Sequence, residues 1–101
     1  MKVAERGRDG FQRTVDEMLT TYGWRFYGVI DQERYARRTL AGFPDRVAWR
    51  GRELIFIEVK GTGGKVTDAQ LICIGELTLA GQRVYVWQPE TPQEDIEAIL
   101  R

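Results

Sequence analysis

The sequence contains no histidine and a single cysteine, Cys73. The absence of histidine excludes the serine and cysteine triads and nearly all common zinc sites. One cysteine cannot form an internal disulfide, which is typical of a reducing compartment, so we expect a cytoplasmic protein. Any metal ion in this chain must therefore be a hard cation held by oxygen ligands.

Long apolar segments are also missing, and proline is scarce. No apolar run approaches the ~20 residues that span a bilayer, and the start lacks the apolar stretch of a signal peptide. We therefore expect no membrane association. Three prolines and 43% hydrophobic residues among 101 predict one folded domain over 1–101 rather than a disordered chain.

The net charge is zero, but the charges are unevenly distributed. Residues 1–52 carry eleven Lys/Arg and seven Asp/Glu, whereas residues 53–101 carry four and eight. Arg34, Arg37 and Arg38 cluster in the basic half, and such a patch can follow a phosphate backbone. A solvated helix or loop face is the other interpretation of this cluster.

Periodicity and turn residues predict seven elements in the order α-β-β-β-α-β-α. They are expected over residues 8–22, 24–30, 45–50, 53–60, 67–80 and 83–87, with a short last helix opened by Pro92. The segment 31–44 reads as a polar connection, with a short helical turn around Tyr35. A helix between two strands favours parallel pairing through a right-handed crossover. We therefore expect an α/β sandwich around a small mixed sheet.

The most informative strand ends in Glu58-Val59-Lys60. Gly51-Arg52 suits a two-residue type II′ hairpin, and pairing Arg50 with Glu53 then places Asp45 opposite Glu58. Cross-strand neighbours have Cβ atoms roughly 4.5–5.5 Å apart. The period of two puts Glu58 and Lys60 on one face of the strand and Val59 on the other.

Two adjacent carboxylates favour a shared cation, because otherwise one of them takes up a proton. Asp45 and Glu58 can each give Mg²⁺ an oxygen, and the Val59 carbonyl a third. Such an ion polarises a phosphoryl oxygen and eases deprotonation of water, while Lys60 orients that water or offsets charge on the phosphate. The alternative is a cross-strand ion cluster in which Lys60 only neutralises Glu58.

Two polar positions downstream have more than one interpretation. Thr67 and Gln70 match a capping box, yet Gln70 can also lean over the site and hold the nucleophilic water. Gly63-Gly64-Lys65 lacks the glycine and hydroxyl positions of a phosphate loop. We read it as a flexible loop whose Lys65 contacts a DNA phosphate.

The apolar residues predict burial beyond a simple core. The run Leu71-Ile72-Cys73-Ile74 is apolar around more than one helix face, which indicates burial by the sheet and by a second subunit. A helix with one exposed Leu or Ile is the alternative. Trp24, Trp49 and Trp87 are expected to pack in or near the core.

Several motifs occur in a fixed order along residues 8–100. They are Gly42-Phe43-Pro44-Asp45, Phe56-Ile57-Glu58-Val59-Lys60-Gly61, Gln70, Gly81 and Val84-Tyr85-Val86-Trp87-Gln88-Pro89. Together they resemble the virus-type replication-repair nuclease (VRR-NUC) domain, a branch of the PD-(D/E)XK nuclease superfamily, in its small stand-alone phage and bacterial form.

The resemblance implies a restriction-endonuclease-like core and DNA cleavage that depends on Mg²⁺ or Mn²⁺. It implies metal ligands at Asp45 and Glu58, a catalytic lysine at Lys60 and the helix glutamine at Gln70. It also implies a homodimer that acts on branched DNA such as four-way (Holliday) junctions.

The chain departs from this pattern at three positions. Such domains often carry a glutamate in the first helix where Arg8 stands; either Asp9, Glu5 or Glu17 substitutes for it, or that ligand is absent. Arg46 follows the aspartate where an apolar residue is usual, and Cys73 stands where an aromatic residue is common.

The leading hypothesis is therefore a homodimeric, divalent-metal-dependent, structure-selective DNA endonuclease of phage or prophage type. The first rival is a DNA-binding or dimerisation module of the same fold with weak or no turnover. Others are a nuclease for linear ends or nicked duplex in a restriction or defence system, and an interaction protein whose acidic C-terminal half binds a basic partner.

Overall fold

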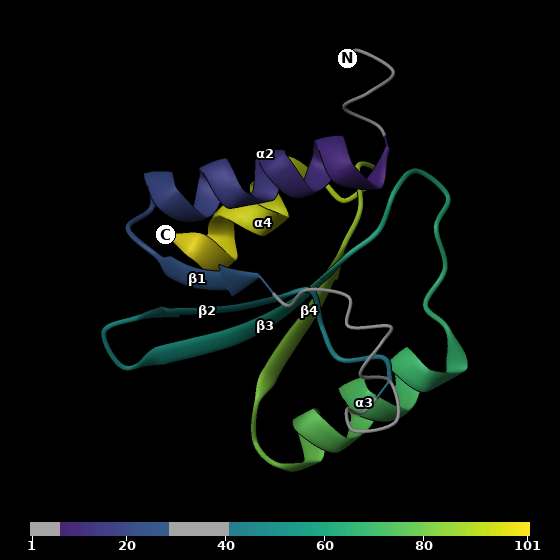
Figure 1. Ribbon diagram of the computed structural model, residues 1–101. Coiled ribbons are helices and arrows are strands. Elements are labelled where there is room, and N and C mark those ends of the chain that lie inside the picture. The colour runs from purple at the N-terminus through teal and green to yellow at the C-terminus, as the bar shows by residue number, and fades with distance from the viewer. Residues whose placement is uncertain (1–6, 29–40) are drawn as a thin grey trace.

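The computed structural model describes residues 7–28 and 41–101. The elements are α2 (Arg8–Thr21), β1 (Arg25–Gly28), β2 (Arg46–Arg50), β3 (Glu53–Val59), α3 (Asp68–Leu79), β4 (Arg83–Trp87) and α4 (Gln93–Leu100). Helices α2 and α4 cover one face of the four-stranded sheet, and helix α3 lies against the other face (Figure 1). The order of the elements confirms the α-β-β-β-α-β-α prediction and the mixed α/β fold.

The strands lie in the order β1-β2-β3-β4, with the first two pairings antiparallel and β3 parallel to β4. Arg50 pairs with Glu53, so the predicted hairpin register is confirmed. Within the turn, Gly51 has a φ of 59° and Arg52 does not have a positive φ, as a type II′ turn requires. The parallel pairing of β3 with β4 is also as predicted.

One apolar core lies between α2, α4 and the sheet. Every fourth residue of α2 faces it, which is the spacing that a helix needs to bury one stripe. Its buried residues are Phe11, Val15, Leu19, Trp24, Ala48, Ile55, Ile57, Val59, Trp87, Ile96 and Leu100. Trp24 donates its indole N–H to the carbonyl of Leu100 at 2.8 Å, which ties the last helix to the end of α2.

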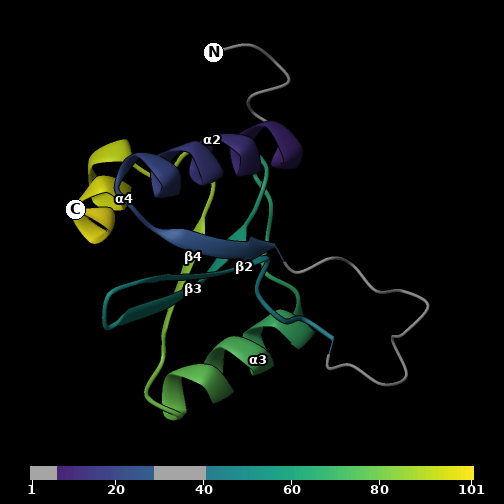
Figure 2. The same cartoon turned by 60° about the vertical axis from the view of Figure 1, so that its left-hand side comes forward.

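Some sequence predictions about strand and core positions were wrong in detail. Strand β1 begins at Arg25 instead of residue 24, although Trp24 is buried in the core as expected. Trp49 is 38% exposed, because it lies on the sheet face opposite α2 and α4, which α3 covers only in part. Figure 2 shows α3 beside β4, away from β1. Residues 29–30 and the turn around Tyr35 lie outside the described residues.

Helix α3 buries only one of its apolar side chains, Cys73. Leu71, Ile72 and Leu79 are 57%, 62% and 90% exposed. The single chain therefore exposes three apolar residues of α3, more than the one exposed Leu or Ile of the alternative, and burial by a second subunit stays a prediction. No helix within 7–28 and 41–101 combines the length and the apolar character that crossing a membrane requires.

Candidate active site

Asp45 lies one residue before β2, where its side chain replaces a backbone partner for β3. The last ladder pair is Arg46 with Ile57, and beyond it the N–H of Val59 donates to Asp45 Oδ2 at 2.7 Å. The N–H and C=O of a strand residue point to the same neighbouring strand, so the Val59 carbonyl also faces Asp45. The sequence prediction that Asp45 sits beside the end of β3 is thus confirmed.

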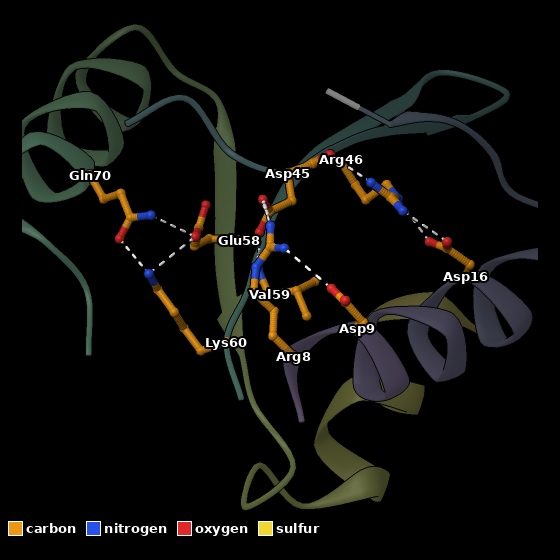
Figure 3. A network of polar contacts seen from close by, with 9 residues as sticks. All are labelled: Arg8, Asp9, Asp16, Asp45, Arg46, Glu58, Val59, Lys60 and Gln70. Atoms are coloured by element: carbon orange, nitrogen blue, oxygen red, sulfur yellow. Dashed lines mark hydrogen bonds and ion pairs between the residues drawn. The ribbon is translucent and has the colours of Figure 1, made fainter. Parts of the chain in front are cut away.

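Glu58 is buried, with 2% of its surface exposed. Its Oε2 accepts a hydrogen bond from Gln70 Nε2 at 2.8 Å and lies 3.3 Å from Lys60 Nζ. Its Oε1 is buried and has no hydrogen-bond partner among the described residues. Figure 3 shows Glu58 between Asp45 on one side and Lys60 with Gln70 on the other. Oε2 of Glu58 therefore has two donors, whereas Oε1 has none among the described residues.

Lys60 and Gln70 complete the polar cluster. Lys60 Nζ donates to Gln70 Oε1 at 2.6 Å, and the backbone N–H of Thr67 donates to the same oxygen at 2.9 Å. The Thr67 hydroxyl accepts from the Gln70 N–H in return, which completes the predicted capping box. Gln70 is thus a helix cap and a neighbour of the carboxylates at once, while a role in holding water stays a prediction.

The electrostatics of the cluster favour a cation. Burial, and then the charge of Asp45, raise the pKa of Glu58 to about 7, and the neighbouring Lys60 opposes this rise. Near neutral pH the Glu58 carboxyl therefore holds a proton more readily than an ordinary glutamate when no cation is bound.

The segment that leads into Asp45 is shaped by close packing against α3. Gly42 has a φ of +86°, and a Cβ placed there would lie 2.5 Å from the backbone of Ala69. Pro44 is buried, and Phe43 packs edge-on against Phe56 with 5.8 Å between ring centroids. Only glycine permits this approach, which brings the first turn of α3, and with it Gln70, up to the carboxylates.

The first helix, α2, places an arginine at the site, where the family pattern often has a carboxylate. Arg8 Nη2 lies 2.5 Å from Asp45 Oδ1. The side chain of Asp9 is 94% exposed and pairs with Arg8 at 3.7 Å, and Glu17 is exposed on the outer face of α2. Glu5 lies outside the described residues. Within 7–28 and 41–101, no third carboxylate, histidine or cysteine joins the pair in a metal-holding group.

Arg46, the second departure from the family pattern, is part of the scaffold. It forms a bidentate ion pair with Asp16 of α2, at 2.8 and 2.9 Å. Planar, two-point pairing of this kind is among the stronger charge contacts. It fixes α2 against β2 close to Asp45.

The donor set suits one hard divalent ion. Asp45 and Glu58 offer carboxylate oxygens, Val59 offers a carbonyl, and Glu58 Oε1 is a buried oxygen that lacks a partner. Mg²⁺ accepts such oxygens and keeps several waters, so it does not need a full cage of protein ligands. The residues present therefore fit a single ion of this class.

Of the four residues predicted to contact DNA, the structure describes one, Lys65. Lys65 is exposed in the segment between β3 and α3, outside the carboxylate cluster. Arg34, Arg37 and Arg38 lie outside the described residues. The sequence interpretation did not foresee the contact of Arg8 with Asp45 or the close approach at Gly42, although both residues stood out in the motif comparison.

Comparison with known proteins identifies the family of the chain. The family model of the VRR-NUC domain matches residues 28–90, a range that contains Asp45, Glu58, Lys60 and Gln70. A solved structure of a VRR_NUC domain protein superposes with a TM-score of 0.65 and 21% identity, covering 92% of this chain and 84% of that chain, which shows a shared fold. No curated protein matches the sequence. Since the family model covers more than half of its residues, the chain belongs to the VRR-NUC domain family of nucleases.

Proposed function

We propose that this chain is a divalent-metal-dependent DNA endonuclease that cuts branched DNA, four-way junctions in particular, as a homodimer. The observation that carries the proposal is the buried Glu58, which lies between Asp45 on one side and Lys60 with Gln70 on the other and has one oxygen without a donor among the described residues. Membership in a nuclease family supports phosphodiester hydrolysis as the reaction.

Asp45, Glu58 and the Val59 carbonyl would hold Mg²⁺ or Mn²⁺. A bound ion would polarise a phosphoryl oxygen and ease deprotonation of an attacking water. The partnerless Oε1 of Glu58 supports this assignment, because a buried carboxylate oxygen without a donor is costly unless a cation reaches it.

Lys60 is proposed to act on the water or on the phosphate. Its ammonium group has three N–H donors, of which Gln70 Oε1 and Glu58 Oε2 take two. The third can donate to water or to a phosphate oxygen, where a fixed positive charge stabilises charge that develops in the transition state. Gln70 keeps this ammonium in place through its own capped amide.

Contacts to the DNA backbone are assigned to the basic residues outside the carboxylate cluster. Lys65 is exposed, and Arg34, Arg37 and Arg38 are the basic cluster of the N-terminal half. Phosphate contacts of this type give affinity that falls with salt and does not depend on sequence. They would position a branched duplex without reading its bases.

The homodimer is assigned to the exposed apolar side of α3. Leu71, Ile72 and Leu79 lie on this side with Gly75 between them, and a Cβ at Gly75 would meet nothing within 4 Å. An exposed apolar stripe of this kind is a candidate for contact with another protein surface. A two-fold axis there would place two sites on one symmetric junction, one for each strand.

Cleavage assays test the proposal directly. Labelled four-way junction, flap and linear duplex are incubated with Mg²⁺, Mn²⁺ or a chelator. Wild type is expected to cut the junction only with a divalent ion, and Glu58→Gln and Lys60→Ala to lose at least ~10²-fold in rate. Glu53→Gln, at the opposite end of β3, is the matched control and should cut like wild type.

A second candidate is favoured by one observation. The ion pair of Arg8 with Asp45 engages a proposed metal ligand, as in a DNA-binding module with weak or no turnover. Junction binding without cutting, with either metal, would support this module and contradict the nuclease.

A further inference from the structure

We infer that Arg8 competes with the divalent ion for Asp45, and so sets how much metal the site needs. This inference rests on the proposed metal-dependent function. Position 8 is where the family pattern often has a glutamate that could bind the metal, and this chain has an arginine there.

The two carboxylates of the site differ in how they are occupied. Asp45 Oδ1 accepts from Arg8 and Oδ2 accepts from the N–H of Val59, so each of its oxygens already has a protein donor. Glu58 accepts from Gln70 and pairs with Lys60 through Oε2, while its Oε1 has no donor among the described residues. An incoming ion therefore finds an oxygen without a donor at Glu58, but at Asp45 it must take the place of a protein donor.

Arg8 sits on the solvent side of this half of the site. Its side chain is 49% exposed, whereas that of Asp45 is 12% exposed. Figure 3 shows the guanidinium reaching Asp45 from the start of α2. An ion that approaches Asp45 from solvent therefore meets the arginine first.

The backbone of Arg8 is held while its side chain can move. Arg8 is the first residue of α2, and a Cβ at Gly61 would lie 3.0 Å from its backbone nitrogen. Among residues 7–28 and 41–101, its ion-pair partner besides Asp45 is the highly exposed Asp9, at 3.7 Å. The guanidinium can therefore leave Asp45 without loss of the helix.

Charge decides the direction of the effect. A guanidinium beside Asp45 stabilises the ionised carboxylate when no metal is present, but a divalent ion at the same carboxylate would be repelled by it. Half-exposed ion pairs are weak, so the ion can displace the arginine, at a cost in affinity. Removal of the charge at residue 8 should therefore tighten metal binding.

The test measures Mn²⁺ binding without DNA, from the electron paramagnetic resonance signal of the free ion. Arg8→Gln is expected to bind Mn²⁺ about 10-fold more tightly than wild type. Arg8→Lys keeps the charge and should stay within about 2-fold of wild type. Arg13→Gln removes an exposed arginine from the same helix and is the matched control, with no change beyond about 2-fold.

The outcomes separate this inference from the proposed function. If Glu58→Gln abolishes binding but Arg8→Gln binds as wild type or more weakly, the metal site stands and the competition is refuted. If neither wild type nor Arg8→Gln binds Mn²⁺, both proposals fail. Arg8→Met, which keeps the length of the side chain, replaces Arg8→Gln if circular dichroism shows that the latter does not fold.

Discussion

Gln70 holds Glu58 through a hydrogen bond from Nε2 to Oε2 of 2.8 Å. The oxygen of the same amide accepts from Lys60 and from the Thr67 backbone, so the helix cap determines which end of the amide faces the carboxylate. The capping box that starts α3 thereby orients the Gln70 amide toward Glu58.

Gln70 and Thr67 should therefore separate catalysis from capping. Gln70→Ala removes a donor to Glu58 and an acceptor of Lys60, and we expect cleavage to fall ~10²-fold. Thr67→Ala removes only the hydroxyl cap, which costs about 1 kcal/mol of stability, and should keep cleavage within a few-fold. Rates together with urea denaturation check this, and an equal loss of rate in both variants would show that Gln70 acts only as a cap.

The stability of the metal-free protein should fall as pH rises. The pKa of Glu58 is about 7 in the folded state and 4.5 as its ordinary value, so between these pH values the unfolded chain releases a proton that the folded chain keeps. The loss begins above pH 4.5 and is complete above pH 7, on the order of 3 kcal/mol. Urea denaturation in a chelator at pH 5 and pH 8 measures it. Glu58→Gln should remove this part of the pH dependence.

Metal affinity should show the opposite trend with pH. Below pH 7 the ion must displace the proton of Glu58, so the Mn²⁺ affinity should fall up to about tenfold for each pH unit. Titration calorimetry at pH 5.5, 6.5 and 7.5 measures the slope. An affinity that is flat over this range would mean that Glu58 is not a ligand.

Gly42 should tolerate no side chain. In Gly42→Ala the new Cβ would lie 2.5 Å from the Ala69 backbone at a φ of +86°, so we expect a loss of about 2–4 kcal/mol and a further loss of cleavage as Gln70 shifts. Gly81→Ala is the matched control, with a φ of +87° and open space around it, and should cost about 1–2 kcal/mol. If the two variants lose similar stability, the cost at Gly42 comes from backbone strain alone and the close contact with Ala69 adds nothing.

The apolar side of α3 should control assembly. Ile72→Glu places a charge on a residue that is 62% exposed, so the fold should keep its stability within about 0.5 kcal/mol while a dimer through this side dissociates. Light scattering should then give 11.7 kDa in place of twice this mass. Glu76→Gln, also exposed on α3, serves as the control and should stay dimeric. A wild type that is monomeric at working concentration would contradict the dimer.

Much of the site could be predicted from the sequence, because the register of a hairpin fixes which residues of its two strands lie opposite each other. Once Gly51-Arg52 sets the turn, the pairing of Arg50 with Glu53 follows, and so does the approach of Asp45 to the end of β3. The period of two then places Lys60 on the face of Glu58. These relations depend on short, regular backbone geometry.

Other features could not be read in this way. The exposure of Trp49 depends on how much of the sheet α3 covers, which local pattern does not determine. The contact of Arg8 with Asp45 joins residues 37 positions apart and depends on where α2 begins relative to β3. Both are matters of how separate elements pack.

Turn chemistry and periodicity were enough to predict the order of the elements, the hairpin register and the approach of Asp45, Glu58 and Lys60 to one another. That Glu58 keeps a buried oxygen without a donor among the described residues, and that an arginine pairs with Asp45, depends on how distant elements pack. The reason is physical: burial and charge pairing depend on which elements meet in space, and two glycines, Gly42 and Gly61, let α3 and α2 come close enough to the site to meet there.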